Sequence, residues 1–208
     1  IVGWSFEQIL LLYGVTRISI GISGYCFDEL FDIGPRYIRS GEFDKILLRP
    51  VHPLISIIGA SREFVSIADF FIGLGITMYM LYRLAIPITI LLIIKIIFFS
   101  IVGALIIGAI NTIFSISSFW TYRSNEVIWS FYRMYTFAEY PLDIYNGFIK
   151  ILITVILPFA FVAYYPTMDY LGLNNYMIYL SPIIAIILWI IAIKLWNLAL
   201  NKYRSTGT

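Results

Sequence analysis

Long uninterrupted apolar runs constrain this chain more than any other feature of its sequence. In residues 88–117 the only charged side chain is Lys95. A helix of about 20 residues is long enough to cross a hydrocarbon core of about 30 Å, and this run exceeds that length. The chain is 61% apolar and 12% charged, whereas soluble domains average about 45–50% apolar and about 25% charged. We therefore expect an all-α integral membrane protein, a polytopic helical bundle.

Five apolar runs are long enough to span a bilayer. The predicted spans are residues 6–27, 64–82, 88–117, 144–165 and 182–200. Pro87 favours a break between the second and third spans, because proline disfavours helical geometry at the residue before it. Pro158 predicts a kink inside the fourth span, because its ring removes a backbone donor. We expect the whole chain, residues 1–208, to form one transmembrane domain.

Basic residues are concentrated in particular connections between these spans. Residues 28–63 contain Arg36, Arg39, Lys45, Arg49 and Arg62. Residues 1–5 and 166–181 contain none. Because lysine and arginine favour cytoplasmic loops, we expect residues 28–63, residues 118–143 and the C-terminus in the cytoplasm. The first residues then lie outside, so we expect a further span upstream of residue 1 and five visible spans out of six.

A short amphipathic pattern lies within the cytoplasmic segment 28–63. Phe43, Ile46 and Leu47 follow i, i+3, i+4 spacing and so share one face of a helix. Two acids begin the pattern and a base ends it, which suits the helix dipole. The pattern predicts a cytoplasmic helix over residues 42–49, which either lies on lipid without a partner or docks a cytosolic subunit. The residues expected to dock such a subunit are Glu42, Phe43, Asp44, Ile46, Leu47 and Arg49.

Three further stretches carry a specific family resemblance together with this loop. The loop segment is residues 39–54, RSGEFDKILLRPVHPL. It resembles the first cytoplasmic loop in permeases of ABC-2 type ATP-binding-cassette exporters. Two later segments also resemble this family: residues 140–145, YPLDIY, and residues 157–166, LPFAFVAYYP. The sequence GWSFEQ near the start resembles the external lead into the family's second span. The resemblance covers nearly the whole chain, although His52 stands where the family usually has asparagine.

The resemblance implies a division of labour between subunits. A separate ATPase subunit would bind ATP and Mg, and residues 42–49 would form the coupling helix that passes its motion into the span beginning at residue 64. A second permease subunit, identical or related, would complete the path. The implied function is ATP-driven export of a small apolar or amphiphilic substrate across the plasma membrane of a prokaryote. On this hypothesis, a charge at Phe43 or Leu47 uncouples transport without unfolding the protein.

The chain lacks the residue patterns of an enzyme. It contains no G-x-x-x-x-G-K-[ST] phosphate cradle, so ATP is expected only on the partner. His52 is its only histidine and Cys26 its only cysteine, which excludes H-E-x-x-H and C-x-x-C metal sites. We expect no catalytic, cofactor or metal site in this chain. A net charge of +2 without a basic block also gives no indication of nucleic-acid binding.

Two other classes of function stay open at this stage. An ion-gradient-driven secondary transporter would show broken helices paired by an internal repeat, and no repeat is evident in the sequence. A membrane scaffold that transports nothing would keep its partners after loss of the charges inside its spans. Neither class requires the pattern between Glu42 and Pro53.

Among the ionisable residues inside the predicted spans, three are candidates for a functional role: Arg17, Asp69 and Lys95. A charge at the bilayer centre costs about 2.5–3.5 kcal/mol on insertion scales, which marks such residues as functional candidates. Arg17 either faces a polar conduit between two permease subunits or pairs within its own subunit, with Asp69 or with the absent span. Lys95 lies eight residues after Pro87, about 12 Å along a helix. We expect its side chain to snorkel toward the outer surface.

A stripe of small residues runs along the third predicted span. Its members recur every four residues and are Ser100, Ala104, Gly108 and Thr112. Small side chains allow another helix to approach closely in a membrane. The stripe therefore packs either against another helix of the same subunit or along a seam between two permeases.

Overall fold

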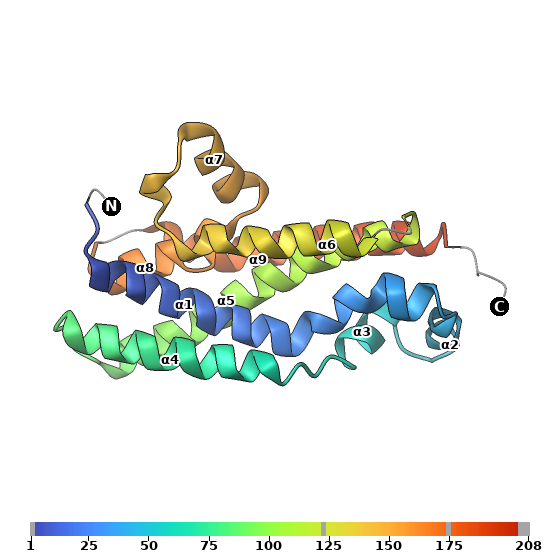
Figure 1. The fold of residues 1–208 in the computed structure, drawn as a ribbon, viewed down its shortest axis with the longest axis horizontal. Helices are drawn as coiled ribbons and strands as arrows, with labels where there is room; N and C mark the ends of the chain where they lie inside the picture. The colour runs from blue at the N-terminus through green and yellow to red at the C-terminus, as the bar shows by residue number, and fades with distance from the viewer. Residues whose placement is uncertain (1–2, 122–123, 174–175, 204–208) are drawn as a thin grey trace.

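The fold is a long helical bundle in a computed structural model that describes residues 3–121, 124–173 and 176–203 (Figure 1). Its α-helices are α1 (Phe6–Phe27), α2 (Glu42–Leu47), α3 (Pro53–Ile58), α4 (Val65–Arg83), α5 (Ile90–Ser115), α6 (Ser124–Arg133), α7 (Gly147–Ile151), α8 (Tyr164–Tyr170) and α9 (Ser181–Leu200). Short 3-10 and π-helical segments join many of them, and no strand occurs in these ranges. The prediction of an all-α membrane bundle is confirmed.

Four helical segments are long and apolar enough to cross a membrane, and they contain α1, α4, α5 and α9. Each corresponds to one of the predicted spans. Local capping explains two of the starts. The hydroxyl of Ser5 accepts a hydrogen bond from the Gln8 amide while the Gln8 side chain accepts one from Ser5, which forms a capping box before α1. The hydroxyl of Thr89 similarly accepts from the Leu92 amide at the start of α5.

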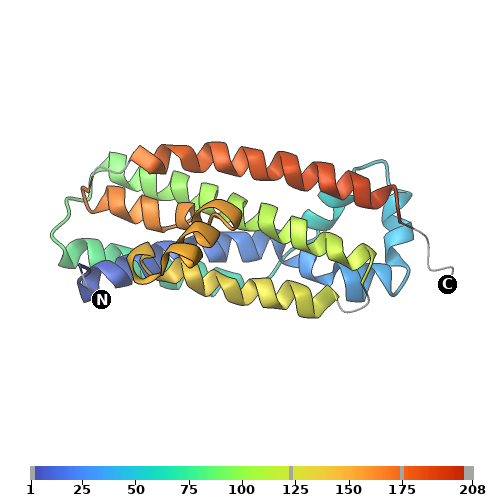
Figure 2. The same ribbon diagram turned by 90° about the horizontal axis from the view of Figure 1, so that it is seen from above.

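The bundle has two ends, which are distinct in Figure 1. The start of α1 and the turn between α4 and α5 lie at one end, which we call the Trp4 end. Helices α2 and α3 and the last turn of α9 lie at the other, which we call the α2 end. Figure 2 shows α6 and α9 at opposite edges of the bundle, with α1 and α5 between them.

Helices α1 and α4 form the closest helix pair, and glycines make the approach possible. A Cβ added to Gly21 would lie 2.5 Å from the Phe70 nitrogen. A Cβ added to Gly73 would lie 2.6 Å from the Ile18 nitrogen. Because van der Waals packing drives helix association in lipid, this backbone-to-backbone contact fixes α4 against α1. It also places polar residues of the two helices beside each other.

The predicted span 144–165 is broken rather than kinked. Helix α7 continues into a π-helical turn, η6 (Leu152–Ile156), and the chain then bends by 70° before the segment that contains α8. Leu157 leaves the helical region, with φ −117° and ψ 82°, because the next residue is Pro158. Figure 1 shows α7 projecting from the side of the bundle.

Residues 118–143 do not all lie at one end, which corrects their assignment to a single cytoplasmic loop. Helix α6 and the following 3-10 helix, η4 (Met134–Glu139), run along the bundle from the α2 end toward its middle (Figures 1 and 2). The indole nitrogen of Trp4 donates a hydrogen bond to Asp143, 3.0 Å away, so Asp143 lies at the Trp4 end. Hydropathy missed this passage because α6 is amphipathic and packs against other helices, so it has no continuous apolar run.

A second apolar core closes the α2 end. It joins α2 and α3 to the ends of α5 and α9 through buried side chains of Phe43, Ile46, Leu54, Ile57 and Trp196. The ring nitrogen Nε2 of His52 also lies 3.0 Å from Asn197 Oδ1, which ties the start of α3 to α9. Helix α2 is therefore anchored to the spans and is not a free surface helix.

Candidate functional site

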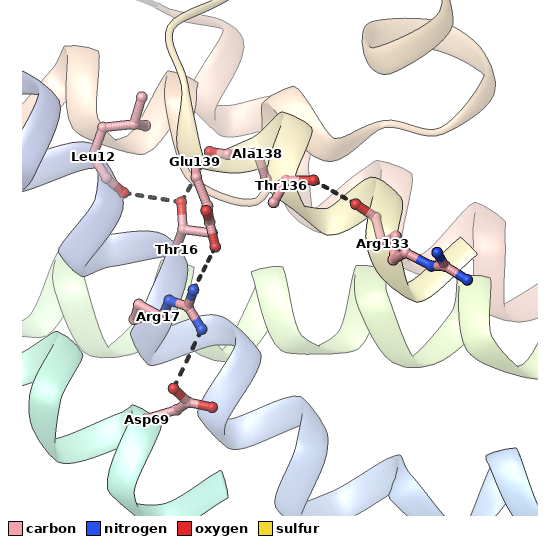
Figure 3. A network of polar contacts seen from close by, with 8 residues as sticks. All are labelled: Leu12, Thr16, Arg17, Asp69, Arg133, Thr136, Ala138 and Glu139. Atoms are coloured by element: carbon pink, nitrogen blue, oxygen red, sulfur yellow. Dashed lines mark hydrogen bonds and ion pairs between the residues drawn. The ribbon is translucent and has the colours of Figure 1, made fainter. Parts of the chain in front are cut away.

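Arg17 joins three separate parts of the fold in the middle of the bundle (Figure 3). Its guanidinium nitrogen Nη1 lies 3.3 Å from Asp69 Oδ1 on α4. Nitrogen Nη2 lies 2.8 Å from Glu139 Oε1 at the end of η4. The guanidinium carbon also lies 4.9 Å from the centroid of the Tyr13 ring, one turn earlier on α1. The planar guanidinium can serve several acceptors at once, which a lysine cannot match geometrically.

The Arg17 network is partly accessible from outside the bundle. The exposed fractions of the side chains are 25% for Arg17, 31% for Asp69 and 11% for Glu139. Within the described ranges, Arg17 Nε is buried without a hydrogen-bond partner. Two carboxylates surround one guanidinium, so the network carries a net negative charge when all three groups are ionised. Of the two roles predicted for Arg17, the pairing with Asp69 is present in the structure, and the accessibility also allows a place beside a conduit.

A hydrogen bond next to the network fixes the position of η4. The hydroxyl of Thr16 donates to the carbonyl oxygens of Leu12 and Ala138, 2.9 Å from each (Figure 3). Thr16 is fully buried. Because an unpaired buried polar group is costly, this bond holds η4 against α1 and keeps Glu139 beside Arg17.

A small polar cavity lies beside the network, toward the α2 end. It encloses about 40 Å³ between α1, α4, α5 and α6. Asp69 of the network is in its wall, together with Asp28, Asn111 and Tyr132. The phenol of Tyr135 donates to Asn111 Oδ1 in the same wall. A polar cavity of this size is large enough for a water molecule. Polar side chains therefore extend from Arg17 along the seam between α1 and α6.

Lys95 forms a second ion pair, whose partner the sequence did not predict. Its ammonium nitrogen lies 2.7 Å from Asp169 Oδ2 on α8. The neighbouring Tyr170 hydroxyl donates to the Lys95 carbonyl oxygen at 3.3 Å. The side chain turns to α8 because a carboxylate in the bundle neutralises it there at short range. The pair links α8 to α5 in the half of the bundle near Trp4.

The small-residue stripe lies inside the subunit. Ser100, Ala104, Gly108 and Thr112 are all buried. A Cβ on Gly108 would lie 2.6 Å from the ring of Phe27. The stripe therefore allows α5 to approach α1, and none of its side chains reaches the surface that a second permease would contact.

Helix α2 points its aromatic side chain into the protein. Phe43 is fully buried, with its ring centroid 5.4 Å from Phe119 and 4.9 Å from Tyr203. Ile46 is also buried. The Tyr203 hydroxyl donates to Asp44 Oδ1 at 3.1 Å, and burial followed by this bond raises the pKa of Tyr203 to about 12. These residues hold α2 in place.

The exposed apolar residues of α2 differ from those predicted to dock a partner. Leu47 is 44% exposed and Leu48, which follows the helix, is 87% exposed. Phe43 and Ile46 cannot form a direct docking contact in this conformation because neighbouring side chains cover them. Of the charged docking candidates, Glu42 lies 3.8 Å from Arg36. Arg49 lies in the wall of a separate cavity.

Sequence reasoning missed Glu139 and Asp169 as the ion-pair partners of Arg17 and Lys95. Glu139 was assigned to a cytoplasmic loop, and Asp169 to a connection outside the spans. A signal was present for Glu139, since it is the only acid in residues 127–142 and aromatic residues surround it. Its partner could not be identified from the sequence because 122 positions separate it from Arg17.

One comparison with known protein families gave a match over nearly the whole chain. The family model described as "ABC-2 family transporter protein" matches residues 1–207. Searches of curated proteins and of solved structures returned no match. The matched family agrees with the resemblance carried by residues 39–54.

Proposed function

The chain belongs to the ABC-2 transporter family and is thus a multi-pass permease component of an ABC transporter, and we propose that it forms the path for ATP-driven export. The proposed substrate is a small apolar or amphiphilic molecule. A separate ATPase subunit hydrolyses ATP with Mg, and a second permease, identical or related, completes the path. The α2 end and the C-terminus face the cytoplasm of a prokaryotic cell.

The exposed polar face of α6 is the observation that carries this proposal. Glu126, Ser130, Arg133 and Thr136 of α6 and η4 are exposed beside the exposed rings of Trp129 and Tyr132, although this segment runs along the bundle between its ends. By contrast, isoleucines dominate the exposed face of α9. Polar side chains are costly against lipid and mark water-filled or protein-covered surfaces of membrane proteins. The face of α6 therefore suits a conduit, whereas the face of α9 suits lipid.

The Arg17 network belongs to the same proposed conduit. Asp69 and Tyr132 share the wall of the polar cavity, which connects the network to α6. The partial exposure of Arg17 and Asp69 makes these charges accessible from that side. Their role in the proposal is to keep the seam between α1, α4 and α6 polar and to hold the two sides of the seam together.

Helix α2 suits the role of coupling helix because one of its faces is exposed and the other packs against the ends of the spans. Leu47 and Leu48 present apolar surface for the ATPase. Phe43 packs on Phe119 at the end of α5 and on Tyr203 after α9. A push on α2 would therefore act on the ends of two spans, in addition to the expected route through the span that begins near residue 64. Rigid packing suits such a role because packed interfaces transmit small shifts.

Chemical labelling tests the proposed conduit directly. Thr136→Cys and Ile187→Cys are prepared separately in a Cys26→Ala background, within the assembled transporter in membranes. A membrane-impermeant maleimide is expected to label position 136, because water reaches the conduit, and to leave position 187 on α9 unlabelled. Equal protection of both positions would contradict the proposal, because water would then not reach the α6 face.

A further inference from the structure

A cavity of about 330 Å³ opens at the α2 end, between α2, α3 and the π-helical segment η2 (Ile33–Ile38). It is separate from the polar cavity beside Arg17, because the two share no wall residue. Its walls contain cationic, hydroxyl and acidic side chains. The polar members are Arg36, Tyr37, Glu42, Lys45, Arg49 and Ser56.

The charges in this cavity do not cancel. Arg36 forms ion pairs with Glu29 and with Glu42, the only acid in the wall. Across the described residues, no ion pair neutralises Lys45 or Arg49. These two cations are four positions apart. The helical turn continues beyond α2 to Arg49, whose backbone amide donates a hydrogen bond to the Ile46 carbonyl oxygen. Like charges at this spacing repel each other.

We propose that this cavity binds a phosphate group in its dianionic form. Its two negative charges would match the unneutralised pair of Lys45 and Arg49. The guanidinium fork of Arg49 suits two phosphate oxygens at once, and the Lys45 ammonium acts as a point charge. The Ser56 hydroxyl in the opposite wall supplies a further donor. An anion between the two cations also removes their mutual repulsion.

Two sources can provide this group: the headgroup of phosphatidic acid and free inorganic phosphate. The surroundings favour the lipid. Ile55, next to Ser56, is 62% exposed, and Val51 in the preceding segment is 47% exposed. Apolar side chains beside cations are typical of a protein surface at the level of lipid headgroups.

Phosphate binding and ATPase docking can fail independently. Leu47 and Leu48, the proposed docking residues, do not line the cavity. Lys45 and Arg49 are exposed side chains, so their replacement by glutamine is expected to leave the fold intact. A binding measurement therefore tests the phosphate site without depending on transport.

The test is titration calorimetry on the complete transporter in non-ionic detergent. The ligands are dihexanoyl phosphatidic acid, inorganic phosphate and dihexanoyl phosphatidylcholine. The double variant Lys45→Gln, Arg49→Gln is compared with the double variant Arg62→Gln, Lys202→Gln, which removes the same charge from exposed positions after α3 and after α9. Thermal unfolding of both variants verifies that they are folded.

We expect phosphatidic acid to bind at least about tenfold more weakly to the Lys45, Arg49 variant than to the control, because charge-assisted hydrogen bonds are lost. If inorganic phosphate shows the same dependence, the free group is sufficient. If only phosphatidic acid shows it, the lipid is the source. Unchanged binding in the Lys45, Arg49 variant would overturn the proposal. So would a phosphatidylcholine affinity equal to that of phosphatidic acid, since apolar contact alone would then explain binding.

Discussion

Arg17 Nη2 on α1 lies 2.8 Å from Glu139 Oε1, although 122 positions separate the two residues in the sequence. The contact brings the end of η4 to the level of the middle of α1. With Asp69 on the other side of the guanidinium, it closes a seam between three segments. The contact therefore places residues 124–139 alongside the spans, which their composition did not indicate.

Arg17→Ala is expected to destabilise the protein. Removing one partner of a buried ion pair costs about 3–5 kcal/mol, and the solvent access of this network reduces the expected loss to about 1–3 kcal/mol. The reason is that Asp69 and Glu139 would face each other without a cation. The measurement is the thermal unfolding midpoint of the purified complex.

Neutralising the two acids provides the control for Arg17. In the triple variant Arg17→Ala, Asp69→Asn, Glu139→Gln, the uncompensated carboxylates are absent, so part of the stability should return. If the triple variant is less stable than Arg17→Ala alone, carboxylate repulsion is not the cause of the loss.

Gly73→Ala is expected to separate α4 from α1. The new Cβ would lie 2.6 Å from the Ile18 nitrogen and 2.8 Å from the Gly14 carbonyl oxygen. Overpacking of this kind costs about 1–3 kcal/mol. Gly75→Ala, two residues along the same helix, is the matched control because its Cβ has nothing within 4 Å. It should stabilise by about 0.5–1 kcal/mol through helix propensity. Equal effects of the two substitutions on the unfolding midpoint would contradict the close packing.

Lys95→Ala is expected to lower the unfolding midpoint more than Lys194→Ala. Lys95 pairs with Asp169 at 2.7 Å, and its loss leaves that half-buried carboxylate without a cation. Lys194 is an exposed residue of α9. Adding Asp169→Asn to Lys95→Ala should restore part of the stability, because the unpaired charge is removed. A midpoint for Lys95→Ala equal to that of Lys194→Ala would show that the ion pair contributes nothing.

Phe43→Ala and Leu47→Asp are expected to act in different ways. Truncating the fully buried Phe43 ring should cost about 3–5 kcal/mol of stability. The exposed Leu47 should change stability by no more than about 0.5 kcal/mol and should weaken only the contact with the ATPase. Unfolding midpoints and ATPase recovery, measured on the same preparations, separate the two effects. A stable Phe43→Ala protein that loses its ATPase would restore the docking role predicted from the sequence.

Four spans could be predicted from the sequence because lipid selects for composition. Helix α5 is predicted over residues 88–117 and found at Ile90–Ser115, and α9 is predicted over 182–200 and found at Ser181–Leu200. A helix with lipid on one side needs a long apolar run, whichever residues it contacts on the other side. The proline after Ile86 also indicated the break between α4 and α5, whereas Pro158 indicated only a kink at the place where the chain bends by 70°.

The positions of α6 and Phe43 could not be predicted for a common reason. Periodicity reports which residues share a face, but not what that face meets. Phe43, Ile46 and Leu47 show helical spacing, and only tertiary packing shows that the first two are covered by Phe119, Tyr203 and their neighbours. Helix α6 likewise shows an amphipathic pattern, which fits both a surface helix and a helix packed along the bundle.

Copurification of an ATPase tests the central claim most directly. The transporter is tagged at its C-terminus, purified in mild detergent from its native membrane and analysed by mass spectrometry. An ATPase bearing a phosphate-binding G-x-x-x-x-G-K-[ST] motif is expected with the unchanged protein. The ATPase should be lost from the double variant Leu47→Asp, Leu48→Asp. It should be retained by the control variant Leu173→Asp, because Leu173 is also an exposed leucine but lies at the Trp4 end. Recovery of the permease without any ATPase, while other membrane complexes stay intact, would contradict the account and favour a secondary transporter or a scaffold.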